Sequence, residues 1–466
     1  MKHTAHGYWL EEAGDRPPLP AAEGELSCDV LVVGGGYTGM WAAWLASQLE
    51  PEATVMLIEA NRCGHGPSGR NGGFANAMWF SAHTLRDRFG SAATADVVRA
   101  AQDAVNGIGR FCSEQEVDAW WRQSGYLQVS AAPAQDGVWS EAAEVCKEIG
   151  EGDAIVELSA GQVRRRCSSP RFRAGAFYPD AATVQPARLA LGLRERIARR
   201  PGVRIFERSP LRRLRSGPWG CLAETPAARI RSGSCVLAVG SASGAAGSPL
   251  RGRLTVTSSH MVLTEPVPDL LDRVGWTGGE AITDGRAMVH YMRTTPDGRI
   301  AFGWGGGRIA CGTRLGGRTE LDRAVVEQVA AHLRSFLPEL EGRRITHAWG
   351  GPIDVSPTHL PVAVPVGADR VFGVFGYTGN GVGTSPMMGR IAASLALGRR
   401  DGHSRLALVD PNPRRVPTGL ASWVGGNAIR AGLVAKEGAE ENGAVADPVS
   451  RILAATPERL GFHIGR

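Results

Sequence analysis

The segment from Cys28 to Glu59 constrains the fold of this chain more than any other. An apolar run at 28–33 leads directly into Gly34-Gly35-Gly36-Tyr37-Thr38-Gly39, and a second apolar run at 55–58 ends in Glu59. The residues between the runs have the spacing of an amphipathic helix, over about 38–49. A strand, a Gly-x-Gly-x-x-Gly turn, a helix and a strand ending in an acid form the dinucleotide-binding fingerprint. The sequence therefore predicts a βαβ unit that binds a dinucleotide.

Each residue of this fingerprint has a physical role. Gly34 permits the tight turn, Gly36 lets backbone N–H groups approach a pyrophosphate, and Gly39 lets helix and strand pack closely. The N-terminus of the helix faces the phosphates, where its dipole favours negative charge. Glu59 is expected to accept hydrogen bonds from a ribose diol.

Composition limits the class of protein. A chain of 466 residues exceeds one hydrophobic core, so we expect two packed domains. The net charge of +6 is carried by arginine, with only three lysines, and no localised basic arm with interleaved aromatic residues is present. Nucleic-acid binding is therefore not expected. A mildly basic surface favours an anionic substrate.

The cysteines and the hydropathy pattern indicate the compartment. The eight cysteines show neither a CxxC pair nor metal-ligand spacing, which favours a reducing compartment without disulfides or a metal site. No stretch of 18 uninterrupted apolar residues occurs, so we expect no membrane insertion. Residues 1–20 lack the apolar stretch of a signal peptide. The expected location is the cytoplasm.

Two kinds of strand pattern follow the fingerprint. Continuous apolar runs at 203–206, 235–239 and 371–375 are typical of strands buried on both faces. Alternating runs at 257–265, 287–293 and 299–304 predict an antiparallel sheet, and hence a second domain inserted into the first. The tail after Gly398 is polar, with one expected helix near 427–438.

These motifs together resemble the D-amino-acid oxidase-like family of FAD-dependent amine oxidoreductases, most closely its branch with γ-glutamylputrescine oxidoreductase. The resemblance covers about residues 8–400. It rests on 34–39, Glu59-Ala60, Ser68-Gly69-Arg70-Asn71-Gly72-Gly73, Trp349-Gly350-Gly351 and Gly376-Tyr377-Thr378-Gly379-Asn380-Gly381-Val382.

The resemblance implies an α/β fold, with a Rossmann-like FAD-binding domain and an inserted α+β substrate domain built on an antiparallel sheet. The implied FAD-binding segments are 1–90, 161–253 and 346–400. The implied substrate segments are 91–160 and 254–345, and residues 401–466 form a C-terminal tail.

The resemblance also implies a set of residues around a non-covalent FAD. Its members are Gly34, Gly36, Tyr37, Thr38, Gly39, Glu59, Ala60, Ser68, Gly69, Arg70, Asn71, Gly72, Gly73, Leu211, Gly240, Gly350, Gly379, Asn380, Gly381 and Val382. The turn at 379–382 would aim a helix N-terminus at the flavin N1–C2=O edge. Oriented N–H groups there stabilise the negative charge of a reduced ring.

Two departures from the family pattern concern lysines. Sarcosine-oxidase relatives place a substrate-clamping lysine after the C-terminal glycine turn, where this chain has Gly383. They also use a lysine over the flavin for reaction with oxygen, and none of the three lysines here lies in the predicted substrate sheet. A simple N-methyl amino acid pocket is therefore not expected, and the electron acceptor, O₂ or another, stays open.

Candidate substrate contacts come from the predicted inserted sheet. His260, Tyr291 and Arg293 are the candidate catalytic residues, and alternation places Tyr291 and Arg293 on one face of their strand. Arg70 either orients the flavin or steers an anion, or it bridges loops. Cys311 is expected to be a buried thiol, and Trp349 to pack beneath the flavin.

The resemblance implies oxidation of a primary or secondary amine, such as an amino acid or polyamine derivative. Hydride transfer to flavin N5 gives an imine that water hydrolyses, with O₂ reduced to H₂O₂. Two alternatives stay open. One is a flavin dehydrogenase of a hydroxy acid or polyol phosphate with another acceptor, and the other is a non-catalytic FAD-containing subunit. The identity of the amine and the oligomeric state are not predicted.

Overall fold

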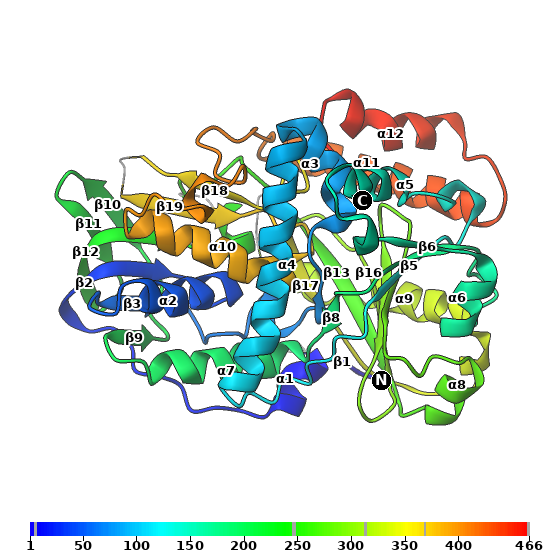
Figure 1. Ribbon diagram of the computed structural model, residues 1–466, viewed down its shortest axis with the longest axis horizontal. Coiled ribbons are helices and arrows are strands. Elements are labelled where there is room, and N and C mark those ends of the chain that lie inside the picture. Colours follow the sequence, from blue (N-terminus) through cyan, green and yellow to red (C-terminus); the bar gives the residue numbers. More distant parts are fainter. Residues whose placement is uncertain (4–6, 245–247, 312–314, 368–369, 464–466) are drawn as a thin grey trace.

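Two large sheets with helices packed around them make up the molecule (Figure 1). The computed structural model describes residues 1–466 apart from 4–6, 245–247, 312–314, 368–369 and 464–466. One sheet carries the dinucleotide-binding fingerprint and the other carries the alternating strands. A short pair, β4 (Phe74–Ala75) with β8 (Ala182–Thr183), forms a separate two-stranded sheet.

The first sheet is largely parallel, with β11 and β19 pairing to different halves of the same edge of β12. Its strand order is β10-β11-β12-β2-β3-β9, and β19 also pairs with β18. The strands are β2 (Gly24–Val33), β3 (Val55–Ile58), β9 (Val203–Phe206), β10 (Arg213–Gly217), β11 (Gly220–Glu224), β12 (Ala228–Leu237), β18 (Val362–Pro365) and β19 (Val371–Phe375). The predicted apolar runs form its buried centre, which confirms the Rossmann-like fold.

Helices cover one face of this sheet. The helices α2 (Tyr37–Leu49), α7 (Pro186–Ala198) and α10 (Gly381–Ala396) contact its strands. The helix α4 (Ser91–Glu114) packs on them from outside, and α3 (Ala82–Phe89) packs on both α4 and α5 (Ser140–Glu148). The helices α2 and α10 cross so closely that a Cβ on Gly389 would lie 2.7 Å from the Cβ of Trp41. Phe111 of α4 packs edge-on against Trp41 and Trp44 of α2. The long α4, which lies in the predicted substrate segment 91–160, thus packs against a helix of the dinucleotide-binding fingerprint.

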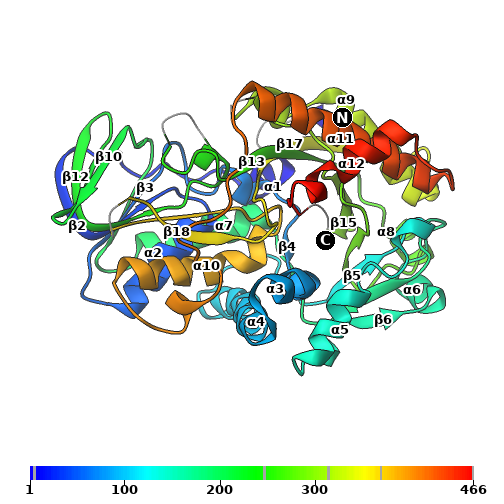
Figure 2. The same cartoon turned by 90° about the horizontal axis from the view of Figure 1, so that it is seen from above.

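The second sheet is mostly antiparallel and curves over the end of the first (Figure 2). Its order is β1-β17-β13-β16-β15-β14-β5-β7-β6. The strands are β1 (Lys2–His3), β5 (Tyr126–Val129), β6 (Val156–Leu158), β7 (Gly175–Tyr178), β13 (Thr255–Thr264), β14 (Ala281–Asp284), β15 (His290–Thr294), β16 (Ile300–Trp304) and β17 (Ile345–Val355). The pairs β14–β5 and β1–β17 are parallel.

Three strands of this sheet come from segments that the sequence analysis assigned to FAD binding. The strand β1 lies within 1–90, β7 lies within 161–253, and β17 lies within 346–400 except for its first residue. The outer face of this sheet packs on α6 (Ala160–Arg166), α8 (Pro268–Arg273) and α9 (Arg323–Phe336).

The C-terminal tail is more ordered than its sequence indicates. The predicted helix at 427–438 extends over α11 (Leu420–Glu441), and a second helix, α12 (Pro448–Arg459), follows. Both lie across the substrate sheet (Figure 2). A short helix α1 (Gly7–Ala13), which the sequence analysis did not predict, buries Trp9 and Leu10 near the N-terminus.

All eight cysteines are free, and Cys311 is exposed, so the expectation of a buried thiol at that position is wrong. Among the described residues, no helix combines the length and apolar character needed to cross a membrane.

Candidate functional site

A cavity of about 2530 Å³ lies between the two sheets. Pockets for drug-sized ligands hold roughly 300–1000 Å³, so this one has room for a dinucleotide and a substrate together. Both glycine turns line it. Of the twenty predicted cofactor residues, all except Gly39 and Gly69 lie in its wall.

The first glycine turn closes tightly because its glycines have no side chains. The N–H of Gly34 donates to the carbonyl of Ile58 over 2.8 Å, and a Cβ on Gly34 would lie 2.4 Å from the oxygen of Ala238. A Cβ on Gly39 would lie 1.9 Å from the oxygen of Gly34, so this glycine allows the contact of helix with strand. Gly36 precedes α2 without a side-chain cap of its own, and the N–H of Tyr37 donates to Ser68, so the N–H groups after Tyr37 are left for an anion.

Glu59 and Leu211 mark one end of the cavity. The Glu59 carboxylate accepts hydrogen bonds from the N–H groups of Gly35 (2.7 Å) and Asn61 (2.8 Å). Burial raises the pKa of Glu59. The remaining lone pairs of its two oxygens fit a ribose diol.

The loop from Ser68 to Gly73 is rigid because it bonds to itself and to its neighbours. The Ser68 hydroxyl accepts from the N–H of Tyr37 over 2.9 Å, and the Asn71 amide accepts from the N–H of Gly73 over 2.7 Å. The Arg70 guanidinium donates to the carbonyl of His65 and pairs with Glu320. Arg70 therefore bridges loops, the last of its predicted roles.

Trp349 lies behind this loop rather than in the cavity wall. Its indole N–H donates to the carbonyl of Arg70 over 2.8 Å, and its ring packs edge-on against Trp9. The side chain is fully buried. Trp349 thus supports the loop from below.

The second glycine turn is held by a buried carboxylate. Asp354 accepts from the N–H of Gly376 over 2.7 Å, and burial raises the pKa of Asp354 to about 6. The turn leads into α10, whose N-cap Asn380 provides no side-chain cap, so backbone N–H groups are left at the cavity. The hydroxyls of Tyr377 and Thr38 lie 2.5 Å apart and join the two glycine turns directly.

Gly383 has no space for a side chain. A Cβ there would lie 2.1 Å from the carbonyl oxygen of Asn76. The clamping lysine of sarcosine-oxidase relatives is therefore excluded at this position by backbone packing.

The structure brings only one of the three candidate catalytic residues to the cavity. Tyr291 lines it, with its hydroxyl 2.7 Å from that of Ser259 and its ring edge-on to Phe74. Gly303 on the neighbouring strand makes room for this ring, since a Cβ there would lie 2.1 Å from the Tyr291 Cζ. Burial raises the pKa of Tyr291 to about 12, so the phenol stays protonated.

His260 lies on the opposite face of β13 from the cavity. Its Nε2 accepts from the N–H of Asp322 over 3.0 Å, and burial lowers the pKa of His260 to about 4. Alternation along β13 turns Ser259 and Met261 into the cavity instead. His260 is therefore a neutral structural residue, and Ser259 and Met261 are among the cavity residues that the sequence analysis missed.

Arg293 shares a face with Tyr291, as alternation predicted, but it points into the protein. Its Nη1 donates to the carbonyls of Val184 and Gly73, and its guanidinium lies 5.7 Å from the ring of Trp9. Burial, with Arg122 nearby, lowers the pKa of Arg293 to about 9. Arg293 anchors the 71–74 loop rather than a substrate.

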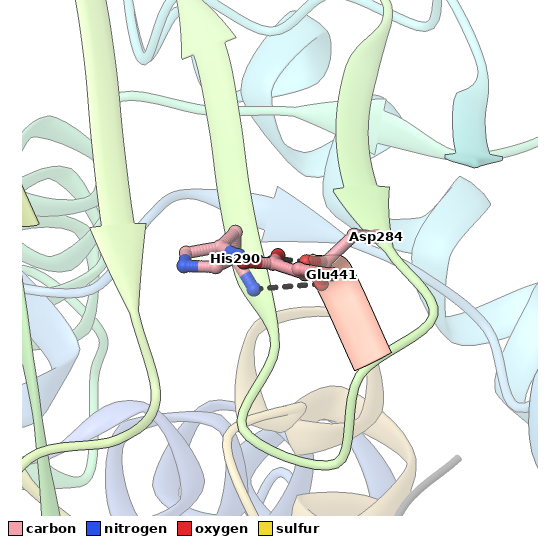
Figure 3. A group of neighbouring side chains, drawn as sticks. All are labelled: Asp284, His290 and Glu441. Carbon is pink, nitrogen blue, oxygen red and sulfur yellow. Dashed lines mark hydrogen bonds and ion pairs between the residues drawn. The ribbon is translucent and has the colours of Figure 1, made fainter. Parts of the chain in front are cut away.

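A buried ion cluster joins the C-terminal helix α11 to the substrate sheet (Figure 3). His290 Nδ1 lies 2.6 Å from a carboxylate oxygen of Asp284, and Glu441 of α11 lies beside them. Three such ligands could in principle hold a metal ion. Arg286 already places a cation there, because it pairs with both Glu441 and Asp284. We therefore assign the cluster to docking of the helix.

Comparison with known proteins identifies the family. A family model described as FAD dependent oxidoreductase matches residues 29–395. The chain belongs to this family. It is 27% identical over 410 residues to a probable oxidoreductase OrdL of Rhizobium meliloti, covering 84% of this chain and 89% of the relative. It is 26% identical over 403 residues to the gamma-glutamylputrescine oxidoreductase of Escherichia coli, covering 85% of this chain and 90% of the relative.

Solved structures of amino acid oxidases share the fold. The crystal structure of glycine oxidase from Geobacillus kaustophilus matches with a TM-score of 0.65 at 17% identity, covering 81% of this chain and 96% of that one. The cofactor of this oxidoreductase is FAD. The residues present fit it, because two helices without side-chain caps, Glu59 and the 68–73 loop all line one cavity.

Proposed function

We propose that this FAD-dependent oxidoreductase oxidises a primary or secondary amine. The cavity continues past the two glycine turns onto the face of the substrate sheet that carries Ser259, Met261 and Tyr291, and this observation carries the proposal. The names of the relatives support an amine as substrate, since one acts on gamma-glutamylputrescine and another on glycine.

The chain's own groups divide the work. When bound without a covalent link, FAD supplies at N5 the acceptor for a hydride from the carbon next to the amine nitrogen. The N–H groups that open α10 lie at the cavity, already oriented, and would stabilise negative charge on a reduced flavin bound there. The hydroxyls of Tyr291 and Ser259 orient the amine by hydrogen bonds. Tyr291 does not act as a general base, because a phenol with a pKa of about 12 stays protonated near neutrality. Water then hydrolyses the imine, and O₂ accepts the electrons to give H₂O₂.

The visible spectrum tests the proposal. The purified protein should show flavin absorbance, and anaerobic addition of amines should bleach it, whereas hydroxy acids and polyol phosphates should not. Peroxide release in air then identifies O₂ as the acceptor. Bleaching by the hydroxy-acid panel alone would replace this proposal with a hydroxy-acid dehydrogenase, and a flavin that no substrate bleaches would indicate a non-catalytic subunit.

A further inference from the structure

The two C-terminal helices form one wall of the cavity. Ile429, Arg430 and Leu433 of α11 line it, together with Pro457 of α12. These helices lie beyond residues 29–395, which the family model matches. Side chains at this wall therefore come from outside the matched part of the chain. We call α11 and α12 together the C-terminal cap.

The cap is fixed to the substrate sheet at several points. Glu437 accepts from the N–H groups of Ala287 (2.7 Å) and Met288 (3.3 Å), beside the ion pair of Arg286 with Glu441. Just after α12, the N–H of His463 donates to the carbonyl of Pro357 over 3.0 Å. The cap is thus a built part of the cavity wall, and its side chains have defined positions.

The arginines of the substrate sheet are already engaged by the protein itself. Arg293 donates to backbone carbonyls, Arg286 pairs with Glu441, and Arg299 pairs with Asp297 over 2.6 Å. These three arginines therefore do not supply the positive charge that would favour an anionic substrate. A cation for the substrate has to come from another element.

Arg430 on the cap is such a cation. Its Nε and Nη2 donate to the carbonyls of Gly306 and Gly307, with Nη2 to Gly306 at 2.6 Å, and these bonds hold the guanidinium plane in place. Within the described part of the chain, Nη1 has no hydrogen-bond partner, and the residue lines the cavity. Gly306 follows closely after Trp304, whose carbonyl accepts from Ser259. Arg430 therefore lies on the same side of the cavity as the Ser259–Tyr291 pair.

The charge around Arg430 is not balanced by the protein. Arg308 and Asp322 are the neighbouring charged groups that act on it. Asp322 is already paired with Arg308 (2.9 Å) and Arg318 (2.6 Å), and no ion pair of Arg430 is formed among the described residues. An anion at Nη1 would complete this balance, and a fixed guanidinium is suited to a carboxylate.

We propose that Arg430 is a specificity-determining residue that binds an anionic group, such as a carboxylate, on the part of the amine that faces the cap. This inference rests on the proposed function and deepens it. The substrate class is then an amine with an anionic group away from the flavin, and not a neutral alkylamine. The position of the contact, on a helix outside the family-matched region, also explains how the chain dispenses with a lysine at Gly383.

Two amines of equal length test the proposal. δ-Aminovalerate and pentylamine differ only in a terminal carboxylate in place of a methyl group. Each is added anaerobically to the FAD-loaded protein, and the dissociation constant is read from the perturbation of the flavin spectrum. We expect δ-aminovalerate to bind at least about tenfold more tightly, as charge-assisted hydrogen bonds allow. In Arg430→Gln the preference should disappear, and in Arg430→Lys it should be partly restored.

The matched control is Lys436→Gln, which removes a positive charge from an exposed ion pair with Glu440 on the same helix. It should keep the wild-type preference. A wild-type protein without a preference would overturn the proposal, as would an Arg430→Gln variant that binds both amines equally more weakly, which is the mark of a purely structural residue. Failure of the proposed function gives a different result from failure of this inference. In that case δ-aminovalerate would still bind more tightly and perturb the flavin spectrum, but no amine would bleach the flavin.

Discussion

The dinucleotide end of the cavity presents mainly backbone groups, from the turns before α2 and α10, whereas the substrate end presents side chains from β13, β15 and α11. In the first region, glycines bring main-chain atoms so close that a single Cβ would collide. In the second, positions are set by contacts between segments far apart in the chain, such as Glu437 with Ala287. The first region is thus sensitive to backbone shape and the second to charge.

The largest effect is expected from Gly39→Val. Its Cβ would lie 1.9 Å from the carbonyl oxygen of Gly34, so the β2–α2 turn cannot close. We expect a loss of about 3 kcal/mol or more in stability and purification without FAD. The control is Gly66→Ala, because Gly66 has an ordinary φ of −79° and no atoms within 4 Å of an added Cβ. Retention of flavin colour by Gly39→Val would refute the close contact.

The next largest effect concerns the docking of the C-terminal cap. Arg286→Met leaves the carboxylates of Asp284 and Glu441 buried without their cation. Removing one partner of a buried ion pair costs about 3–5 kcal/mol. We expect a lower unfolding midpoint and faster proteolytic release of residues after Gly398. Arg318→Met removes an exposed guanidinium from Asp322, which keeps its pair with Arg308, and should cost less than about 1 kcal/mol. Equal costs for the two variants would contradict the assignment of the cluster.

The pH dependence of stability gives a further test of the cap. Burial raises the pKa of Glu437 from its ordinary 4.5 to about 7, so the folded protein holds more protons than the unfolded chain between these pH values. Stability therefore falls as the pH rises through this window. Glu437→Gln resembles the protonated acid and should remove this fall. Between pH 4.5 and 7, the unfolding free energy of the wild-type protein should therefore drop by about 2 kcal/mol relative to that of the variant. Parallel curves from pH 4.5 to 7 would exclude a buried, proton-binding Glu437.

The contrast between the two regions also explains what the sequence could predict. Strands such as Val55–Ile58 and Val371–Phe375 have the predicted bounds, because short apolar runs between glycines and polar residues are unambiguous. The glycine turns were found for the same reason, since their function depends on backbone geometry that glycine alone permits.

The face of a strand that meets the cavity could not be predicted in the same way. His260 and Ser259 are neighbours on β13, and with helices on one side and the cavity on the other, both sit in enclosed surroundings. Polarity therefore does not distinguish the two faces of β13, and the sequence pattern favours His260 over Ser259 as a catalytic candidate. The extent of α11 was missed because Gly425 and Gly426 weaken its helix pattern. Its position depends on partners that are distant in sequence, Arg286 above all.

The smallest expected effect separates the two regions most cleanly. Tyr377→Phe removes the hydroxyl that bonds Thr38 and joins the two glycine turns. Such a bond contributes about 1 kcal/mol, so FAD affinity should fall roughly fivefold. Tyr126→Phe removes a comparable buried bond, to Thr283 within the substrate sheet, at a residue that does not line the cavity.

We expect similar losses of stability from both variants, measured by denaturant unfolding of the protein without FAD. Only Tyr377→Phe should weaken FAD, measured by fluorescence titration, because only that bond sets the distance between the two turns. A loss of FAD affinity in Tyr126→Phe of equal size would mean that the two regions respond to mutation as one unit.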